Sequence, residues 1–584
     1  MLHETALIAT IATGLGLAFL FGLLTSRLHL PPILGYLLAG VAVGPFTPGF
    51  VANTALAPQL AELGVILLMF GVGLHFSITD LLSVRRIAVP GAIAQIIAAA
   101  ILGAFVAWLW GWSWGSGLVF GLSLSVASTV VLLRSLEDRG ALDSVDGRIA
   151  VGWLIVEDLV TVLVLVLLPL FSKVLGDLAQ ENANTAGFSG IFGIDFMKIL
   201  GLMLLKMATF GILMFAVGRR VVPWLLGNVV KTGSRELFTL AVLAIALGIA
   251  VGAATLFGVS IALGAFFAGV IVNESDFSHE AASNALPLQD AFAVLFFVSV
   301  GMLFDPRILI QQPLDVIAVV LIILVGKSLA SFLIVLAFGY PLHTALTISA
   351  SLAQIGEFSF ILVALAISLG LLPKEAQSLI VAGAMISITI NPFIFRSLAP
   401  VERWIRRWRG LASALERPAG ALAQLLPSVD AGRLHDHVVL IGYGRVGASV
   451  VEELALHNIP YVIIEQSRER IEALREIGLP VIFGDATRPE VLGDAHLERA
   501  RLVLVSTPDA YHSRAILALA KRLNPAIDVV IRTHSDEERM FLESNGAVRA
   551  LVEEREMAIS LTRHALRRFG VIHDMEAVAA RALK

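Results

Sequence analysis

The stretch WLIVEDLVTVLVLVLL, Trp153–Leu168, decides the fold, because it places two adjacent carboxylates inside an apolar run. With its flanks, the run is long enough for a membrane-spanning helix, which we predict over residues 147–171. A charge at the centre of such a helix costs about 2.5 to 3.5 kcal/mol. Glu157 and Asp158 therefore indicate a functional site inside the membrane or, if the helix begins later, an interfacial pair.

The composition around this stretch is that of a membrane region followed by a soluble domain. Residues 1–400 contain 17 Lys/Arg and 21 Asp/Glu, and the remaining 184 of the 584 residues contain 25 and 25. Only the second part reaches the charged fraction of soluble proteins, about 25%. The net charge of −4 arises in the first part, and no basic surface indicates binding of nucleic acid. The absence of cysteine excludes disulfides and thiolate-bound cofactors.

Hydropathy predicts an all-α domain of about thirteen membrane-spanning segments over residues 1–400. The segments lie near residues 6–26, 33–50, 56–76, 87–110, 117–136, 147–171, 196–218, 237–252, 254–273, 288–304, 314–338, 343–370 and 375–397. No basic residues precede the first segment, so we expect a retained helix and not a cleaved signal.

Lys and Arg residues are unevenly distributed over the predicted loops. Loops on one side contain Arg27, Arg85, Arg86, Arg134, Arg139, Arg148, Arg219, Arg220, Lys231 and Arg235. Loops on the other side contain Lys173, Lys198, Arg307 and Lys374. Because cytoplasmic loops are the richer in Lys and Arg, we predict an N-terminus outside and a cytoplasmic C-terminal domain in a bacterial-type inner membrane.

Two predicted spans are interrupted by polar and small residues, Ser123–Thr129 in the fifth and Ser351–Ser359 in the twelfth. Interrupted helices at matching places in two halves are typical of transporters built from inverted repeats. The alternative is that small residues only let neighbouring helices approach closely.

The embedded charges are candidates for an ion and proton site. Burial favours the protonated form of Asp158 and a nearby cation favours the charged form, so this group can hold either a proton or a metal ion. Lys327 is the only charge in the eleventh span; either it pairs with Glu157 or its side chain reaches a helix end. Glu357 follows Gln354 in the twelfth span and either takes part in the site or braces the interruption. His343, at a predicted loop edge, is expected to be solvated or to pack locally.

The C-terminal part has a different pattern. Residues 401–433 are predicted to form a basic, Trp-containing interfacial helix followed by a linker. Six short β-branched runs then alternate with helical stretches over residues 434–554, which predicts a doubly wound parallel α/β sheet of the Rossmann type. We expect residues 555–584 to form a helical tail.

The first β-run ends in a motif that binds phosphates in dinucleotide sites, GYGRVG, composed of Gly442, Tyr443, Gly444, Arg445, Val446 and Gly447. Glu465 ends the next strand, where an acidic side chain can bind ribose hydroxyls and favours NAD(H) or AMP over NADP. Asp485, Ala486 and Thr487 follow the third strand, where they are expected to approach the adenine. The alternative is a sheet retained for dimerisation with an empty pocket.

These residues carry a resemblance to a known family. The chain resembles Kef-type potassium:proton antiporters, of the monovalent cation:proton antiporter superfamily, over nearly its whole length. The supporting stretches are GYLLAGVAVGP (Gly35–Pro45), LAELGVILLMFGVGL (Leu60–Leu74), Ser128-Thr129, Glu157-Asp158, FFVSVGMLFD (Phe296–Asp305) and SLAQIGEFSF (Ser351–Phe360). The C-terminal part is similar to the nucleotide-binding half of a regulator of potassium conductance (RCK N) domain.

The resemblance implies a homodimer of thirteen-helix subunits, with crossed, unwound helices at Ser128-Thr129 and near Gln354. It implies that Asp158 carries the cation and the proton and that Lys327 faces the site. It also implies paired cytoplasmic domains that gate transport through NAD(H) or AMP, and in some members glutathione or its conjugates. Glu157 departs from the amide that Kef-type members often have beside the carrier, which leaves the stoichiometry open.

The sequence therefore favours a secondary antiporter over an enzyme. We expect no catalytic cofactor and no metal other than the transported cation, which we expect to be K⁺ in preference to Na⁺. A ligand-gated potassium channel is the second hypothesis, but the chain lacks a T-V-G-Y-G filter. A membrane-bound NAD-dependent oxidoreductase is the third, but no second cofactor motif is present.

Overall fold

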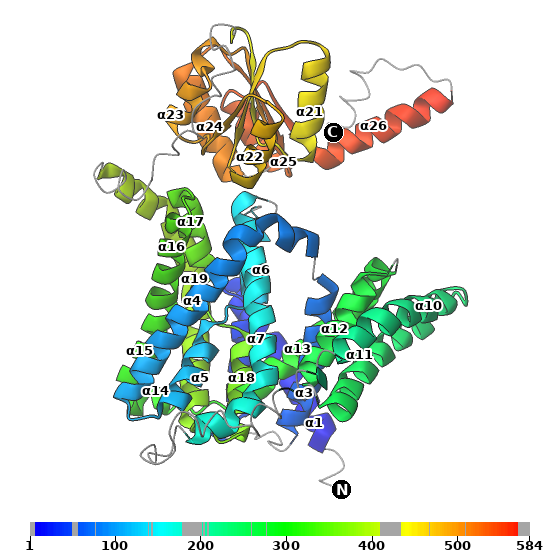
Figure 1. The fold of residues 1–584 in the computed structure, drawn as a ribbon, viewed down its shortest axis with the longest axis vertical. Coiled ribbons are helices and arrows are strands. Elements are labelled where there is room, and N and C mark those ends of the chain that lie inside the picture. The colour runs from blue at the N-terminus through cyan, green and yellow to red at the C-terminus, as the bar shows by residue number, and fades with distance from the viewer. Residues whose placement is uncertain are drawn as a thin grey trace. The chain divides into compact units, whose positions relative to one another are not determined.

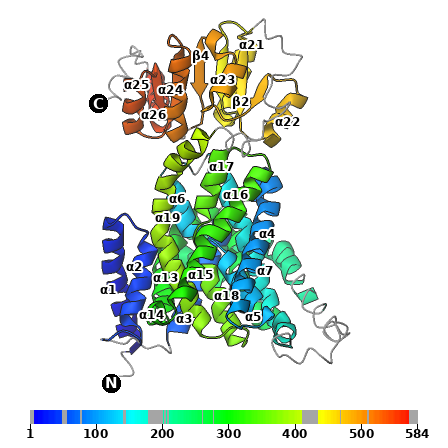
Figure 2. The same cartoon turned by 90° about the vertical axis from the view of Figure 1, so that its left-hand side faces the viewer.

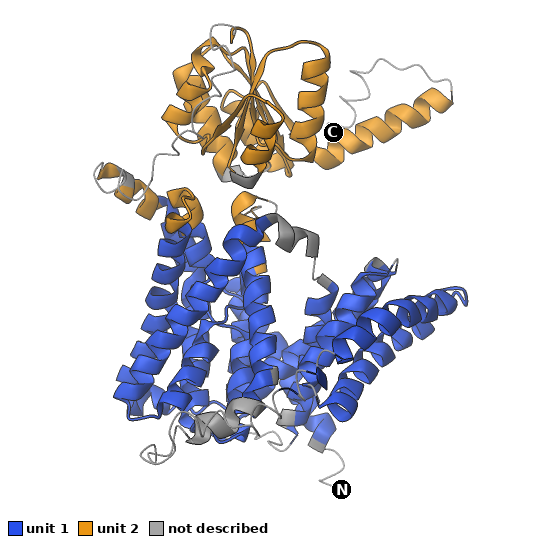
Figure 3. Cartoon of the chain, in the orientation of Figure 1, with its two compact units in different colours: residues 1–132, 150–335, 346–399 blue, residues 133–149, 336–345, 400–584 orange. Residues whose placement is uncertain are grey.

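The computed structural model describes residues 6–48, 56–75, 78–137, 139, 141, 144–177, 201, 205–206, 209–258, 260–275, 277–408, 434–466, 468–507 and 510–569. The chain forms two compact units (Figure 3). Unit 1 comprises Met1–Leu132, Ala150–Val335 and Leu346–Ala399, and unit 2 comprises Leu133–Ile149, Leu336–Ala345 and Pro400–Lys584. Most of the predicted linker before residue 434 lies outside the described residues.

The first 400 residues are helical wherever the structure describes a regular element. The elements are α1 (Ala6–Arg27), α2 (Pro32–Val43), α3 (Ala57–His75), α4 (Ile78–Leu109), α5 (Trp114–Ser125), α6 (Thr129–Glu137), α7 (Val145–Asp177), η1 (Met214–Gly218), α10 (Arg219–Val230), α11 (Arg235–Phe257), α12 (Ile261–Asn273), α13 (Ser278–Met302), α14 (Ile308–Gln311), α15 (Pro313–Leu321), η2 (Ile322–Lys327), α16 (Ser328–Ala337), α17 (Leu342–Ser351), α18 (Glu357–Ser368) and α19 (Glu375–Arg407).

Among the described residues, nine helices are long and apolar enough to cross a membrane, and four shorter apolar helices accompany them. Within unit 1, α3, α11, α12 and α13 pack together, while α4 packs beside α5 and α5 contacts α18 (Figure 1). Several helices of unit 1, among them α4, α15 and α19, run roughly along one direction (Figure 2). The predicted all-α membrane domain is confirmed, and the number of thirteen spans stays a prediction.

Two predicted helix ends are wrong. The seventh span was expected at residues 196–218, but a helix covers Thr209–Val230, and residues 196–200 lie outside the described part. Arg219 and Arg220 therefore belong to a helix and not to a loop. Arg is a good helix former, and Arg219 pairs with Glu274 at 2.9 Å. Likewise, the last span does not end at residue 397, because α19 continues to Arg407.

Both predicted interruptions are present. Residues 126–128 separate α5 from α6, and residues 352–356 separate α17 from α18. A helix end inside an apolar domain leaves backbone N–H and C=O groups without intrahelical partners. These groups need side-chain partners, and the candidate site is formed by those partners.

The C-terminal part contains the predicted sheet of six parallel strands. The strands are β1 (Val438–Ile441), β2 (Tyr461–Glu465), β3 (Val481–Phe483), β4 (Leu502–Val505), β5 (Asp528–Thr533) and β6 (Arg549–Val552), in the order β3-β2-β1-β4-β5-β6. The helical elements between and after them are α21 (Arg445–Leu456), α22 (Arg468–Glu476), α23 (Pro489–Asp494), η5 (Leu497–Arg499), α24 (Ala510–Leu523), α25 (Asp536–Ser544) and α26 (Glu553–Arg568).

Both faces of the sheet are covered by helices (Figures 1 and 2). Alternate residues of β1 belong to different hydrophobic clusters: Leu440 packs in one with α21 and α22, and Val439 and Ile441 pack in another with α24. Two buried faces explain why the strand sequences are continuously apolar. The order reverses between β1 and β4, which is where ligands bind in sheets of this kind.

Candidate functional site

The two helix interruptions of unit 1 lie against each other. The amide of Gln354 bonds both backbone groups of Ser128: its oxygen accepts from the Ser128 N–H at 2.9 Å, and its nitrogen donates to the Ser128 carbonyl at 3.1 Å. A Cβ added at Gly356 would lie 2.4 Å from Ser128 Cα, so only glycine permits this approach. Segments more than 220 residues apart in sequence thus form one site.

Three buried carboxylates each accept one hydrogen bond from the interruption between α5 and α6 or from Thr129, the residue that follows it. Glu157 accepts from the Ala127 N–H at 2.9 Å, Asp158 from the Thr129 hydroxyl at 3.0 Å, and Glu357 from the Ser128 hydroxyl at 3.1 Å. The second oxygen of each carboxylate has no hydrogen-bond partner among the residues that the structure describes. These oxygens can accept a proton or contact a cation.

Lys327 is fully buried at the end of η2, a π-helical segment inside a long apolar helix. π-Helical turns occur frequently at functional sites. Its Nζ donates to the Gln354 carbonyl at 3.2 Å, a group that the interruption of α17 and α18 leaves free. Lys327 and Glu157 also attract each other electrostatically, although the hydrogen bond goes to Gln354. Lys327 therefore does not reach a helix end.

The charges of this cluster do not balance. With Glu157, Asp158 and Glu357 ionised, Lys327 compensates only one of the three, and buried unpaired charges are strongly unfavourable. Either protons or a cation must make up the difference. The cluster can therefore bind a cation in competition with protons, which is the chemistry that the sequence predicted for Asp158.

Two amides that the sequence analysis missed complete the interruptions. Gln95 of α4 donates to the carbonyl of Ser125, the last residue of α5, at 3.1 Å. Asn391 of α19 donates to the carbonyl of Ala350, near the end of α17, at 2.8 Å. Both side chains are buried. The only signal in the sequence was an amide within an apolar run, which does not indicate its partner.

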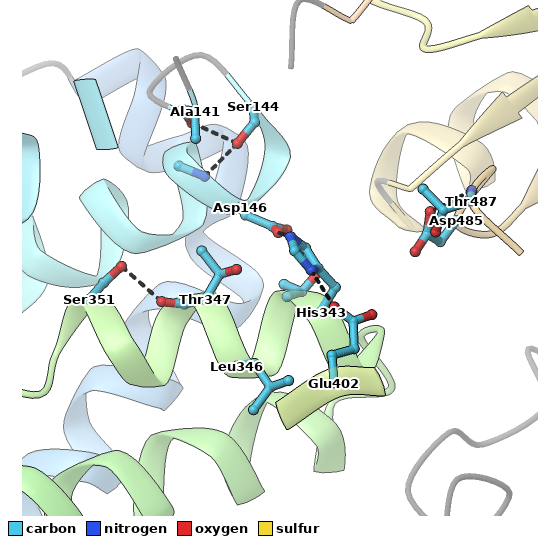
Figure 4. A network of polar contacts seen from close by, with 12 residues as sticks. Ala141, Ser144, Asp146, His343, Leu346, Thr347, Ser351, Glu402, Asp485 and Thr487 are labelled. Carbon is cyan, nitrogen blue, oxygen red and sulfur yellow. Dashed lines mark hydrogen bonds and ion pairs between the residues drawn. The ribbon is translucent and has the colours of Figure 1, made fainter. Parts of the chain in front are cut away.

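A second polar cluster, within unit 2, joins the ends of α7, α17 and α19 (Figure 4). Thr344 donates to Asp146 at 2.7 Å, and the His343 ring lies 3.0 Å from a Glu402 oxygen and 3.7 Å from Asp146. His343 is therefore not a solvated loop residue. The cluster holds together the starts of α7, which contains Asp158, and of α17, which leads to Gln354.

The GYGRVG motif forms the expected loop between β1 and α21. Gly442 has a φ of 91°, a backbone conformation that residues other than glycine rarely adopt. The helix α21 begins at Arg445. A Cβ at Gly447 would lie 2.3 Å from the Gly442 carbonyl, so Gly447 serves helix packing. A Cβ at Gly444 would have no neighbour within 4 Å. Gly444, Arg445 and Val446 are exposed, so the loop leaves space for a phosphate at the N-terminus of α21.

Glu465 ends β2 and is buried beside this loop. Its carboxylate accepts from the Tyr443 N–H at 2.8 Å and from the Gln466 N–H at 2.9 Å, and it pairs with Arg470 at 3.1 Å. Glu465 thus connects the glycine loop to β2. Gly442, Glu465, Gly484 and Ala486 border one pocket at the carboxyl ends of the strands, as expected for a nucleotide.

Asp485 and Thr487 form a tight turn after β3. The Asp485 carboxylate accepts from the Thr487 N–H at 2.8 Å. Burial raises the pKa of Asp485, but His512 and the hydrogen bonds from Thr487 outweigh burial and leave the pKa below its usual value. An anionic Asp485 next to Ala486 therefore contributes negative charge at this end of the sheet.

Comparisons with known proteins match both parts of the chain. The model of the sodium/hydrogen exchanger family, transmembrane, matches residues 15–400, and that of the TrkA-N domain matches residues 438–553. An Escherichia coli (strain K12) protein described as a cation/proton antiporter, YbaL, is 52% identical over 558 residues, 96% of this chain and 97% of its own. A protein of Alkalimonas amylolytica described as a K⁺ efflux antiporter, KefB, is 30% identical over 553 residues, 94% of this chain and 80% of its own.

Two solved structures correspond to the C-terminal part. The crystal structure of the TrkA-N domain of E. coli ybaL is 37% identical and covers 22% of this chain and 97% of that one, with a TM-score of 0.22. A Kef C-terminal domain of Shewanella denitrificans in AMP-bound form is 23% identical and covers 25% of this chain and 87% of that one, with a TM-score of 0.21.

Proposed function

Because the chain belongs to the sodium/hydrogen exchanger family, we propose that it exchanges a monovalent cation for H⁺ through the carboxylate of Asp158. The observation that carries this proposal concerns that side chain, which is buried and accepts from Thr129 through one oxygen, while the other oxygen has no hydrogen-bond partner in the described part of the chain. The preferred cation is K⁺, a proposal supported by the name of the KefB relative. The protein acts in the inner membrane with its N-terminus outside.

The exchange follows from competition between the proton and the cation for the carboxylate of Asp158. When Asp158 loses its proton to water, its carboxylate attracts a cation, and when the cation leaves, the carboxylate takes up a proton. Interrupted helices supply free carbonyl groups that can replace part of the cation's hydration shell. If the site can change the side to which it opens only while it holds a proton or a cation, the proton flux and the cation flux are coupled. Lys327 and Glu157 compensate each other and keep the remaining charge on Asp158.

The C-terminal domain is proposed to regulate this exchange by binding NAD(H) or AMP. The proposal is supported by the open space at Gly444, by the pocket beside Glu465, and by the AMP-bound Kef domain among the similar structures. The nucleotide phosphate would lie at the N-terminus of α21, where N–H groups and the helix dipole favour an anion. The chain is further proposed to act as a homodimer.

Substitution of Asp158 tests the proposal. Purified protein in liposomes that contain a pH-sensitive dye is exposed to K⁺, Na⁺ and Li⁺ in turn. Asp158→Asn should reduce cation-dependent proton movement to the level of empty liposomes, because an amide cannot exchange a proton for a cation. Asp315→Asn, in the first turn of α15, is the matched control and should keep wild-type exchange. Normal exchange by Asp158→Asn would refute the proposal, and cation flux without proton flux would indicate a channel.

A further inference from the structure

We infer that Glu357 remains a protonated, neutral acid throughout the transport cycle and that Asp158 alone exchanges its proton. The inference rests on the proposed function, and it assigns to Glu357 the role of a positioning residue that sets the charge of the site. The consequence is an exchange of one proton for one cation without net charge movement.

The surroundings of Glu357 do not support a negative charge. Its side chain is fully buried, one oxygen accepts from the Ser128 hydroxyl at 3.1 Å, and the other finds no hydrogen-bond partner within the described ranges. No Lys or Arg among the described residues forms an ion pair with it. A charge on Glu357 would repel a charge on Asp158, and two carboxylates that share a site do not readily ionise together.

Lys327 interacts with groups other than Glu357. Its Nζ donates to the Gln354 carbonyl and is attracted by Glu157. Glu157 also accepts a backbone N–H bond, from Ala127, which stabilises a carboxylate. Of the three acids, Glu157 is therefore the one whose surroundings stabilise a negative charge.

The charges then balance only if Glu357 stays neutral. In the cation-loaded site, the bound cation compensates Asp158 and Lys327 compensates Glu157. In the proton-loaded site, Asp158 is neutral and the Lys327–Glu157 pair is unchanged. Ionised Glu357 would leave one unpaired buried charge in both states. The opposing effects are the N-terminal dipole of α18 and the hydrogen bonds from the Ser128 hydroxyl and from the backbone N–H of Glu357 itself, but such contributions are smaller than the cost of burying an unpaired charge.

The proton balance is simple. The O–H bond of Asp158 breaks, its proton passes to water on the side to which the site is open, and the cation binds the carboxylate. The O–H bond of Glu357 remains intact, and its carbonyl oxygen continues to accept from Ser128. Because each step replaces one positive charge by another, the membrane potential does not drive the exchange.

Infrared spectroscopy of the purified full-length protein tests the protonation of Glu357 without any transport. The protein is saturated with K⁺ at alkaline pH, where Asp158 is charged. We expect the carbonyl stretch of a protonated carboxylic acid in the wild type, its loss in Glu357→Gln and its return at a shifted frequency in Glu357→Asp. The control Glu375→Gln, at an exposed residue in the first turn of α19, should keep the band. A wild-type spectrum without this band, or a band that persists in Glu357→Gln, would overturn the inference.

The coupling ratio provides the second measurement. In liposomes with imposed K⁺, pH and electrical gradients, wild type and Glu357→Gln should both exchange one proton per cation and respond equally little to the electrical gradient. A ratio of two protons that falls to one in Glu357→Gln would make Glu357 a carrier and refute the inference. Failure of the proposed function is distinguishable, because it would appear as unaltered exchange by Asp158→Asn whatever the infrared result.

Discussion

At the scale of single residues, Gly356 determines whether the two interruptions can meet. A Cβ at this position would lie 2.4 Å from Ser128 Cα, so Gly356→Ala must push the two segments apart. Overpacking of this kind costs about 1 to 3 kcal/mol, and the loss of the Gln354–Ser128 bonds should lower exchange at least about tenfold (1.4 kcal/mol). The measurement is thermal unfolding in detergent together with the liposome assay.

Gly252→Ala is the control for that substitution. Gly252 lies inside α11, and apart from its chain neighbours and the backbone of its own helix no described atom lies within 4 Å of an added Cβ. Alanine there should stabilise the protein by about 0.5 to 1 kcal/mol through helix propensity. Equal unfolding temperatures for the two variants would contradict the steric argument.

His437 is expected to make the C-terminal domain sensitive to acid. Burial is the largest effect and lowers the pKa of His437 below its ordinary value of 6.5, against the hydrogen bond to the Ala495 carbonyl at 2.9 Å. The unfolded state therefore binds more protons, so stability falls as the pH decreases through 6.5 towards the pKa of the folded state. Unfolding midpoints measured from pH 8 to 5 should show this loss. His437→Gln should reduce it, and the exposed His457→Gln should not.

At the scale of elements, the interrupted helices depend on amides from neighbouring helices. Gln95→Leu leaves the buried Ser125 carbonyl without a donor among the described residues, at a cost of about 1 to 3 kcal/mol. Asn391→Leu leaves the Ala350 carbonyl with only the long bond from the Ala353 N–H at 3.3 Å, at a smaller cost of about 0.5 to 1.5 kcal/mol. Both should lower the unfolding temperature and weaken cation-dependent proton movement. The exposed Gln311→Leu should do neither. If both buried variants unfold like the wild type, the interruptions do not need these bonds.

The positions of the interruptions followed from local sequence, but their partners did not. Polar and small residues inside apolar runs predict where a membrane helix breaks. An isolated Gln or Asn carries no information about which distant carbonyl it bonds. The end of the seventh span was misplaced because hydropathy ended the span at residue 218, so Arg219 and Arg220 were counted in a loop. In the structure both belong to α10, and Arg219 pairs with Glu274.

At the scale of the whole molecule, regulation requires that a nucleotide at unit 2 alters transport in unit 1. Gly444→Val places a side chain in open space next to the phosphate position and should not disturb the fold. Affinity of the full-length protein for AMP or NADH, measured by calorimetry, should fall at least about tenfold (1.4 kcal/mol). Exchange by this variant should no longer respond to the nucleotide, and basal exchange should be retained. Unchanged affinity would show that the nucleotide binds elsewhere.

The sequence by itself determined the division into a membrane domain and a parallel α/β domain, the six strands, the glycine loop and the acids inside the membrane. These features are local, since apolar length, strand periodicity and motif spacing are all properties of short segments. Only the tertiary structure decided that Ser128 and Gln354 bond each other, that Lys327 donates to a freed carbonyl, and that Glu357 forms no ion pair with a Lys or Arg of the described residues. The Ser128–Gln354 bonds join residues 226 apart and the Lys327–Gln354 bond joins residues 27 apart, and no local pattern encodes which distant group will satisfy a buried polar atom.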